Sequence, residues 1–141
     1  MKLYIVRHGL TQWNLDKIIQ GCIDTELLPQ GRDDAQVLSE KIGDYPVEIV
    51  YTSPLRRAYD TAQILNQSIK KPLVVKEKLR EIEFGDWEGL TWREVKEKYP
   101  DLLADNEIGY ANPPNGETFL QAKERVGSAV EEIIEKQQDC L

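Results

Sequence analysis

The sequence contains a single histidine, His8, and only two cysteines, Cys22 and Cys140, among its 141 residues. Any histidine chemistry must therefore use His8. The two cysteines lie far apart and lack the short spacing of metal ligands, so neither a zinc site nor a disulfide framework is indicated. We expect a cytoplasmic protein on this cysteine usage.

Basic charge and long apolar runs are also scarce. The net charge is −7, which argues against a general nucleic-acid or membrane surface, because both favour an excess of Lys and Arg. The apolar run at the start is too short for a signal peptide or a membrane span. The length predicts one domain over residues 1–141. The net charge is still compatible with a small anionic ligand, because clustered arginines can reverse the potential inside a cleft.

The most informative stretch follows the apolar run at residues 3–6, which predicts a short buried strand. Arg7, His8 and Gly9 come directly after it. Ligands of open α/β sheets bind outside the carboxyl ends of the strands, and a guanidinium offers a planar fork that suits phosphate. We expect a small anion to bind here.

Strands and helices alternate along the chain. Apolar spacing predicts a helix over residues 31–43, a strand over 47–52, a helix after Pro54 and a strand over 72–75. This order predicts an α/β fold with parallel pairing and right-handed crossovers.

A second cation follows the strand at 47–52. Ser53 before Pro54 is typical of a helix N-cap, which places Arg57 in the first turn of the helix. Free backbone N–H groups and the helix dipole favour an anion there. Arg56 is the better candidate for a solvated side chain.

Carboxylates and apolar residues are interleaved from Leu79 to Gly89. Some of these acids should be partly buried, and burial raises a carboxyl pKa toward the range of a proton donor. Spacing alone does not choose among the four candidates, Glu81, Glu83, Asp86 and Glu88.

Capping boxes mark two further helices. One begins after Thr91 and ends before Pro100, and the other begins after Thr118 and runs to about Gln138. Residues 101–110 are ambiguous, with a short helix and a turn expected, and they are a plausible cover over the cleft.

Several of these stretches together resemble the histidine phosphatase superfamily, the phosphoglycerate-mutase-like family. The matching motifs are Arg7-His8-Gly9-x-Thr11-x-x-Asn14, Ser53-x-x-x-Arg57-Ala58-x-x-Thr61, Leu79-x-Glu81 with Gly85-x-Trp87-Glu88-Gly89, and Gly116-Glu117-Thr118 followed by Arg125. The resemblance implies a three-layer α/β/α fold with a mostly parallel sheet. Leu28 departs from it, because a Thr or Ser cap is common at that position.

The resemblance also implies a role for each candidate site residue. His8 is the nucleophile that becomes phosphohistidine, and Glu81 is the proton donor and acceptor. The expected phosphate and substrate ligands are Arg7, Arg57, Asn14, Thr11, Gln20 and Gly21. It implies no metal and no cofactor, and a small phosphate monoester as the substrate.

Three functions remain open on this resemblance. The stretch Gly85–Thr91 and its short spacing to Pro100 resemble the phosphatase branch, which includes α-ribazole phosphatase, so we expect a phosphomonoester hydrolase. A phosphoglycerate mutase is the first alternative. The second is an inactive remnant that binds a phospholigand or a partner.

Family members continue with a strand ending in His-Gly, between the first two strands of the sheet. No second histidine occurs here. We therefore expect a C-terminally truncated member that lacks one or more strands and has impaired activity, and we expect self-association as one way to complete the sheet.

Overall fold

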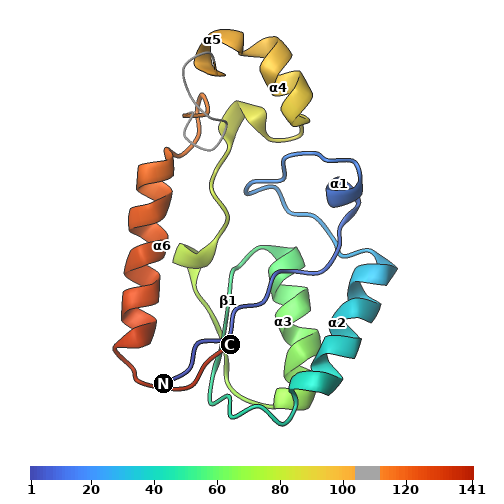
Figure 1. Cartoon of the computed structure of the whole chain (residues 1–141), viewed down its shortest axis with the longest axis vertical. Helices are drawn as coiled ribbons and strands as arrows, with labels where there is room; N and C mark the ends of the chain where they lie inside the picture. Colours follow the sequence, from blue (N-terminus) through green and yellow to red (C-terminus); the bar gives the residue numbers. More distant parts are fainter. Residues whose placement is uncertain (104–111) are drawn as a thin grey trace.

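The computed structural model describes residues 1–103 and 112–141. Its elements, in chain order, are α1 (Gln12–Leu15), α2 (Pro29–Ile42), β1 (Val50–Thr52), α3 (Arg56–Ile69), β2 (Leu73–Val75), the 3₁₀ helices η1 (Glu77–Leu79) and η2 (Gly85–Trp87), α4 (Trp92–Lys98), α5 (Pro100–Leu103) and α6 (Phe119–Ile134). Figure 1 shows α6 on one side of β1 and the paired helices α2 and α3 on the other. The α/β class and its layers are as predicted.

The central pairing is parallel, which confirms the prediction from the strand–helix–strand order. Strands β1 and β2 pair with Val50 opposite Leu73 and Thr52 opposite Val75. Side chains alternate across β1 because the strand period is two. Val50 packs into the core beneath α2 and α3, whereas Tyr51 packs against Ile133 on the α6 side.

The predicted strand at residues 3–6 is wrong as a regular element. Only Leu3 forms a bridge, a parallel one with Cys140, which bridges Ile49 on its other side. The chain's last residues therefore lie between the first segment and β1, at the position where the resemblance places a further strand. Beyond Tyr4, the first segment has no neighbour at strand distance among the described residues, so it forms no ladder.

Several helix boundaries differ from the predicted ones for local reasons. Helix α2 begins at Pro29, because proline suits a first helical position, and its N-cap, Leu28, makes no side-chain capping bond. Ser53 is not the N-cap of α3; that residue is Leu55, whose N–H donates to Ser53 Oγ. Helix α6 ends at Ile134 instead of near Gln138.

The capping boxes at Thr91 and Thr118 are present as predicted. Helix α4 begins after Thr91 and covers a separate aromatic core formed by Ile19, Trp87 and Val95. The expected short helix after Tyr99 is α5, and most of the expected cover at residues 101–110 lies outside the described residues.

Candidate active site

A cavity of about 350 Å³ lies beside the start of α3 and the loop that follows the first segment. Every candidate residue except Thr11 contributes to its wall. The lining residues are Arg7, His8, Asn14, Ile19, Gln20, Gly21, Arg57, Glu81, Phe84 and Trp92. Residues from five separate stretches thus converge on one pocket, as expected for strand ends that share one edge of a sheet.

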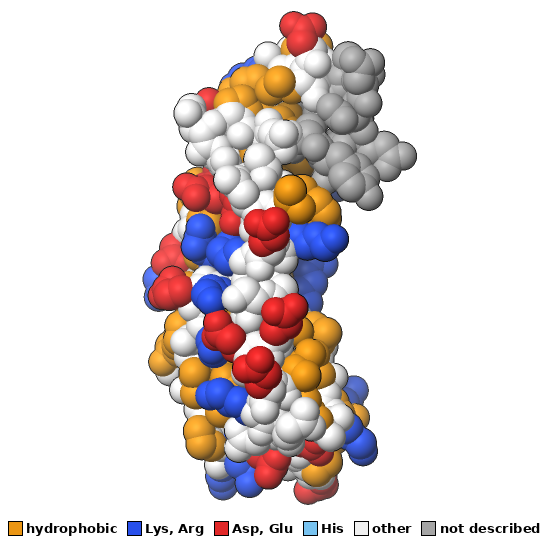
Figure 2. Space-filling model, turned by 90° about the vertical axis from the view of Figure 1, so that its left-hand side faces the viewer, with side chains coloured by type: hydrophobic (Ala, Val, Ile, Leu, Met, Phe, Trp, Pro, Cys, Tyr) orange, Lys and Arg blue, Asp and Glu red, His pale blue; other side chains and the backbone are white. Residues whose placement is uncertain are grey.

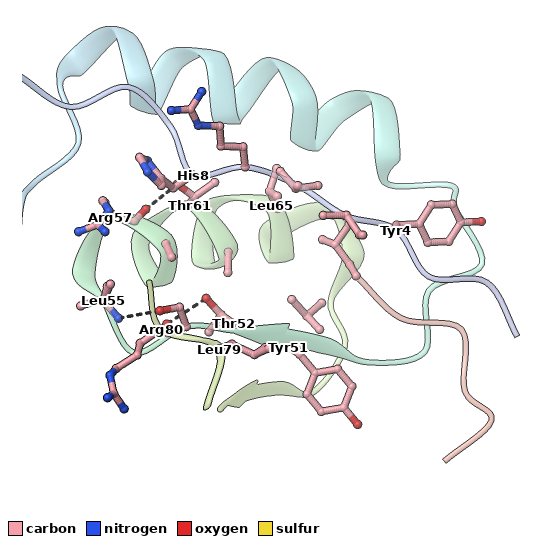
Figure 3. A pocket seen from close by; sticks show the side chains of 18 of the residues that line it. Tyr4, His8, Tyr51, Thr52, Leu55, Arg57, Thr61, Leu65, Leu79 and Arg80 are labelled. Atoms are coloured by element: carbon pink, nitrogen blue, oxygen red, sulfur yellow. Dashed lines mark hydrogen bonds between the residues drawn. The ribbon is translucent and has the colours of Figure 1, made fainter. Parts of the chain in front are cut away.

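The same site borders a larger cavity of about 510 Å³ that runs between the first segment and β1. Arg7, His8, Arg57 and Glu81 line both cavities. Figure 3 shows the side chains of His8 and Arg57 close together at one end of the larger cavity. The imidazole and the guanidinium therefore face a common space.

The half-buried imidazole of His8 is fixed by its own loop. Nδ1 lies 2.7 Å from the carbonyl oxygen of Gly9, and because a carbonyl only accepts, Nδ1 must carry the proton. Nε2 is then the unprotonated nitrogen of the neutral ring. Burial lowers the pKa of His8 below 6.5, and the charges of Arg57 and Arg7 lower it further, against the opposing effects of the Gly9 hydrogen bond and Glu81.

Arg57 is only 2% exposed and lies in the first turn of α3. Its Nη1 donates to the carbonyl of Ile23 at 2.9 Å, and its Nη2 donates to that of Gly21 at 2.8 Å. Its buried Nε has no partner among the described residues. Burial lowers the pKa of Arg57, yet a guanidinium stays charged in proteins, so the pocket is lined by a buried cation.

Arg56, by contrast, points into solvent, as the sequence indicated. Its side chain is 52% exposed and forms an ion pair with Glu26. Arg7 is also exposed but lies on the rim of the pocket beside His8, so the site has one buried and one accessible guanidinium.

Thr11 lies behind the pocket instead of in its wall. It is fully buried and caps α1 by accepting the N–H of Asn14. Its hydroxyl also lies 2.9 Å from Asn14 Oδ1 and 3.0 Å from Gln20 Oε1, and its single proton satisfies one of them at a time. Thr11 therefore orients two lining side chains, and the structure does not bring it to the expected ligand position.

Asn14 and Gln20 do line the pocket. Asn14 Oδ1 accepts the backbone N–H of Thr11, which leaves the Asn14 amide NH₂ group free for the pocket. The Gln20 loop is held in place by backbone hydrogen bonds between Ile19 and both Gly89 and Leu90. Gln20 and Gly21, which the resemblance implies as ligands, thus reach the site.

Two glycines owe their identity to close packing. Gly9 lies against the carbonyl of Gly31, where an added Cβ would come within 2.6 Å of that oxygen. Gly21 has a φ of +51°, and an added Cβ would lie 2.0 Å from Glu88 Oε1. Gly9 therefore allows a close approach to the chain's own helix α2.

Among the four acids that spacing left open, only Glu81 lines the pocket. Glu88 accepts the N–H groups of Cys22 and Phe84, and Asp86 accepts from the side chain of Asn115. Glu83 lies at the surface beside Arg80. The expected partial burial is found at Glu88, whereas the side chain of Glu81 is exposed on the open side of the cavity.

Sequence reasoning missed the apolar wall of the pocket. Phe84 and Trp92 meet edge to face at 5.8 Å, and their only sequence signal is their position beside the matched motifs. Thr61 was matched but given no role. It accepts the N–H of Gly9 at 2.9 Å and donates to the carbonyl of Arg57 at 2.7 Å, which ties the His8 loop to α3.

In residues 1–103 and 112–141, no group of three or more His, Cys, Asp or Glu side chains is arranged to hold a metal ion. No helix of these ranges has the length and apolar character needed to cross a membrane.

The imidazole of His8, the adjacent Arg7 and the buried Arg57 at the start of α3 thus line one pocket. The chain belongs to the histidine phosphatase superfamily (branch 1), whose family model matches residues 3–140.

Curated relatives include both phosphatases and mutases. Phosphoserine phosphatase 1 of Hydrogenobacter thermophilus is 30% identical over 135 residues, which is 94% of this chain and 64% of that protein. Glucosyl-3-phosphoglycerate phosphatase of Mycobacterium tuberculosis is 35% identical over 134 residues, 94% of this chain and 60% of that protein. A 2,3-bisphosphoglycerate-dependent phosphoglycerate mutase of Cytophaga hutchinsonii is 38% identical over 137 residues, 94% of this chain and 64% of that protein.

Solved structures agree with this assignment. The α-ribazole phosphatase of Shigella flexneri superposes with a TM-score of 0.90 at 32% identity, over 100% of this chain and 72% of that one. Mycobacterial glucosyl-3-phosphoglycerate phosphatase with inorganic phosphate superposes with a TM-score of 0.76 at 37% identity, over 91% of this chain and 60% of that one. The chain thus spans 60–64% of the length of the three curated relatives described.

Proposed function

We propose that the chain carries the site of a phosphomonoester hydrolase that works through a phosphohistidine on His8. The observation that carries the proposal is the neutral imidazole with a free Nε2 beside the buried guanidinium of Arg57. Nε2 attacks phosphorus and the bond to the leaving oxygen breaks. Covalent catalysis of this kind divides one displacement into two steps.

The remaining polar groups have complementary roles. Arg57 and Arg7 offset the charge that develops on the phosphoryl oxygens, which is the main catalytic task in phosphoryl transfer. The Asn14 amide adds a neutral donor. Glu81 gives its proton to the departing alkoxide and then takes one from the water that attacks the phosphohistidine. Because His8 is the chain's only histidine, no second imidazole assists, and we expect slow turnover.

The test is acid-labile labelling of the chain by a ³²P-labelled monoester, beside a His8→Ala control. We expect label in the parent and none in the control, with slow release of inorganic phosphate. Equal label in both chains would refute His8 as the nucleophile.

The hydrolase and the mutase are distinguished by the fate of the phosphate. Relatives of both kinds match at similar identity, and the proposal favours hydrolysis on the match of Gly85–Thr91 to the phosphatase branch. Release of inorganic phosphate from a generic monoester supports this choice. Conversion of 3-phosphoglycerate without phosphate release would instead support the mutase.

A binding remnant is the second candidate function. It is favoured by a preformed pair of guanidiniums in a chain with a single histidine. Phosphate binding without acid-labile label at His8 would support it. Loss of phosphate affinity in Arg57→Ala is expected for the hydrolase and the remnant alike, so unchanged affinity would count against both.

We further propose that the chain self-associates through the larger cavity. The backbone groups of Ile5, Val6 and Arg7 form no hydrogen bond with any described residue, and the cavity beside them is largely apolar. Unpaired strand groups are a template for pairing with another chain. A mass that rises with concentration in analytical ultracentrifugation supports this proposal, and a constant monomer mass refutes it.

Both cysteines are free thiols, which agrees with the proposed cytoplasmic location.

A further inference from the structure

The segment that carries Glu81 has little regular structure of its own. It leaves η1 at Leu79 and reaches η2 at Gly85 without helix or strand between them. The carboxylate of Glu81 accepts one hydrogen bond, from the neighbouring N–H of Ile82 at 2.9 Å. Its position over the pocket must therefore come from whatever holds its backbone.

Arg125 of α6 holds that backbone. Its Nη1 donates to the carbonyl oxygens of Lys78 and Arg80, both at 2.9 Å. Its Nη2 donates to the carbonyl oxygen of Glu81 itself at 3.3 Å. One guanidinium thus satisfies three carbonyls of an irregular segment, which a planar fork of donors can do and an ammonium on a flexible stem cannot.

Glu117 fixes the guanidinium in turn. Its carboxylate accepts Arg125 Nε at 2.7 Å and also accepts Nη2. The side chain of Arg125 is 13% exposed and that of Glu117 is 10% exposed, so the pair is mostly withdrawn from water. Hydrogen bonding to Arg125 lowers the pKa of Glu117, and the same bond raises the pKa of Arg125. The pair therefore stays ionised.

Glu117 also reaches the far side of Glu81. Its backbone N–H donates to the carbonyl of Glu83 at 2.7 Å. The carbonyls of Lys78, Arg80, Glu81 and Glu83 are consequently held from the loop and helix that contain Glu117 and Arg125. The proton donor lies between these two anchored points.

We propose that the Arg125–Glu117 pair is the positioning element of the proton donor, setting where the Glu81 carboxyl meets the leaving-group oxygen. This inference rests on the proposed function and adds two residues to it. Neither side chain lines the 350 Å³ pocket, so both act through the backbone of Glu81 instead of touching the substrate.

The same helix offers a matched control. Two turns after Arg125, Glu132 forms ion pairs with Lys76 at 2.7 Å and Lys78 at 2.6 Å. These pairs lower the pKa of Glu132 to about 2, but its side chain is 42% exposed. Figure 2 views the molecule from the α6 side and shows such acidic and basic side chains interspersed over it. Glu132 ties α6 to the start of the same segment without reaching Glu81.

The experiment compares a phosphoryl donor whose leaving group needs protonation with a phosphoryl donor whose leaving group does not. An alkyl phosphate has a poor leaving group that requires the acid, whereas p-nitrophenyl phosphate leaves readily without it. The readout is the rate of acid-labile labelling of His8 by each donor, so slow hydrolysis of the intermediate does not hide the result. Thermal melts of every variant monitor folding.

If the pair positions Glu81, variants of the pair should slow His8 labelling by the alkyl donor and spare labelling by the aryl donor. Glu81→Gln should slow labelling by the alkyl donor about tenfold to a hundredfold, within the range of general acid catalysis, and leave the aryl donor nearly unchanged. Arg125→Met and Glu117→Gln should reproduce that pattern, and Arg125→Lys should restore part of the rate. The double variant Glu81→Gln/Arg125→Met should lower the alkyl-to-aryl ratio no further. Glu132→Gln should leave the ratio unchanged.

Other outcomes overturn the inference in distinguishable ways. An unchanged ratio in a folded Arg125→Met chain, or equal loss for both donors, assigns the pair a structural role only. An unchanged ratio in Glu81→Gln would mean that Glu81 is not the proton donor, and the pair would then have no donor to position. Absence of label from the aryl donor in the parent chain refutes the proposed function instead.

Discussion

His8 combines a fixed tautomer with a preference for the neutral ring. The Gly9 carbonyl holds the Nδ1 proton, and burial near two guanidiniums lowers the pKa below 6.5. The Gly9 bond selects the tautomer with a free Nε2, and the lowered pKa favours the neutral ring at neutral pH. The nucleophile thus needs no separate base at pH 7.

The labelling rate should therefore be flat above pH 6.5 and fall only below it, as His8 takes up a proton. Arg7→Ala removes a positive neighbour, which raises the pKa of His8 and should move the acid limb to higher pH. The unfolded chain binds more protons between the lowered pKa and 6.5, so the stability contribution of His8 rises with pH there. Labelling rates from pH 4.5 to 8 test this. An acid limb that stays in place in Arg7→Ala would contradict it.

Arg57 and Arg56 are neighbours with opposite environments, which makes them a matched pair. Arg57→Ala leaves two loop carbonyls without their charged donor, so we expect a loss of about 2–4 kcal/mol in the free energy of unfolding. It should also slow His8 labelling about a hundredfold to a thousandfold. Arg56→Ala breaks an exposed ion pair, worth about 0–1 kcal/mol, and should leave labelling unchanged. Urea melts and labelling assays decide; similar effects in both variants would contradict the assignment.

At the scale of elements, the helices differ in how their first turns are capped. Helices α1, α4 and α6 each begin with a complete capping box. Helix α2 begins after Leu28 with no side-chain cap, although the backbone of Leu28 is extended as an N-cap requires. Its start is held by backbone hydrogen bonds instead, from Leu28 to Leu10 and from Arg32 to Leu28.

Leu28→Thr should therefore stabilise the chain by about 0.5–1 kcal/mol, because it supplies the missing side-chain acceptor. Thr118→Ala is the opposite control and should destabilise by about 1 kcal/mol by removing a cap that is present. Chemical denaturation of both variants gives the comparison. A loss of stability in Leu28→Thr would mean that the half-buried Leu28 side chain contributes more through packing than a cap does.

At the scale of the whole molecule, the two sides of the first segment have different surroundings. Ile5 is 86% exposed and borders the larger cavity, whereas Val6 packs against the core beneath α2 and α3. Successive side chains of an extended segment point to opposite sides. One side is thus covered and the other is open.

Ile5→Asp should leave the stability of the monomer within about 0.5 kcal/mol, as is usual for surface positions. It should also weaken the proposed self-association, because it places a charge on the open face. Val6→Asp should destabilise the monomer by about 1–3 kcal/mol by burying a polar group. Sedimentation and thermal melts separate the two effects. Unchanged association in Ile5→Asp would place the contact elsewhere.

Much of the site was predictable because its residues follow local signals. His8, Arg57 and Glu81 each lie in a short motif, and all three line one pocket. Thr11 was misplaced because a motif does not state which way a side chain points: in the fold its hydroxyl turns inward to cap α1. Phe84 and Trp92 were missed because an aromatic residue reads the same in sequence whether it lines a pocket or packs in a core.

The sequence by itself determined helices α2, α3, α4 and α6, the capping boxes of α4 and α6, the parallel order of β1 and β2, and the candidate site residues, because periodicity, caps and short motifs are local. Only the tertiary structure decided that the segment at residues 3–6 is not a ladder strand, since pairing depends on what lies beside it. It alone brought Arg125 to the backbone of Glu81 and Glu117 to the backbone of Glu83. Those contacts join residues more than 30 positions apart, and no local pattern encodes them.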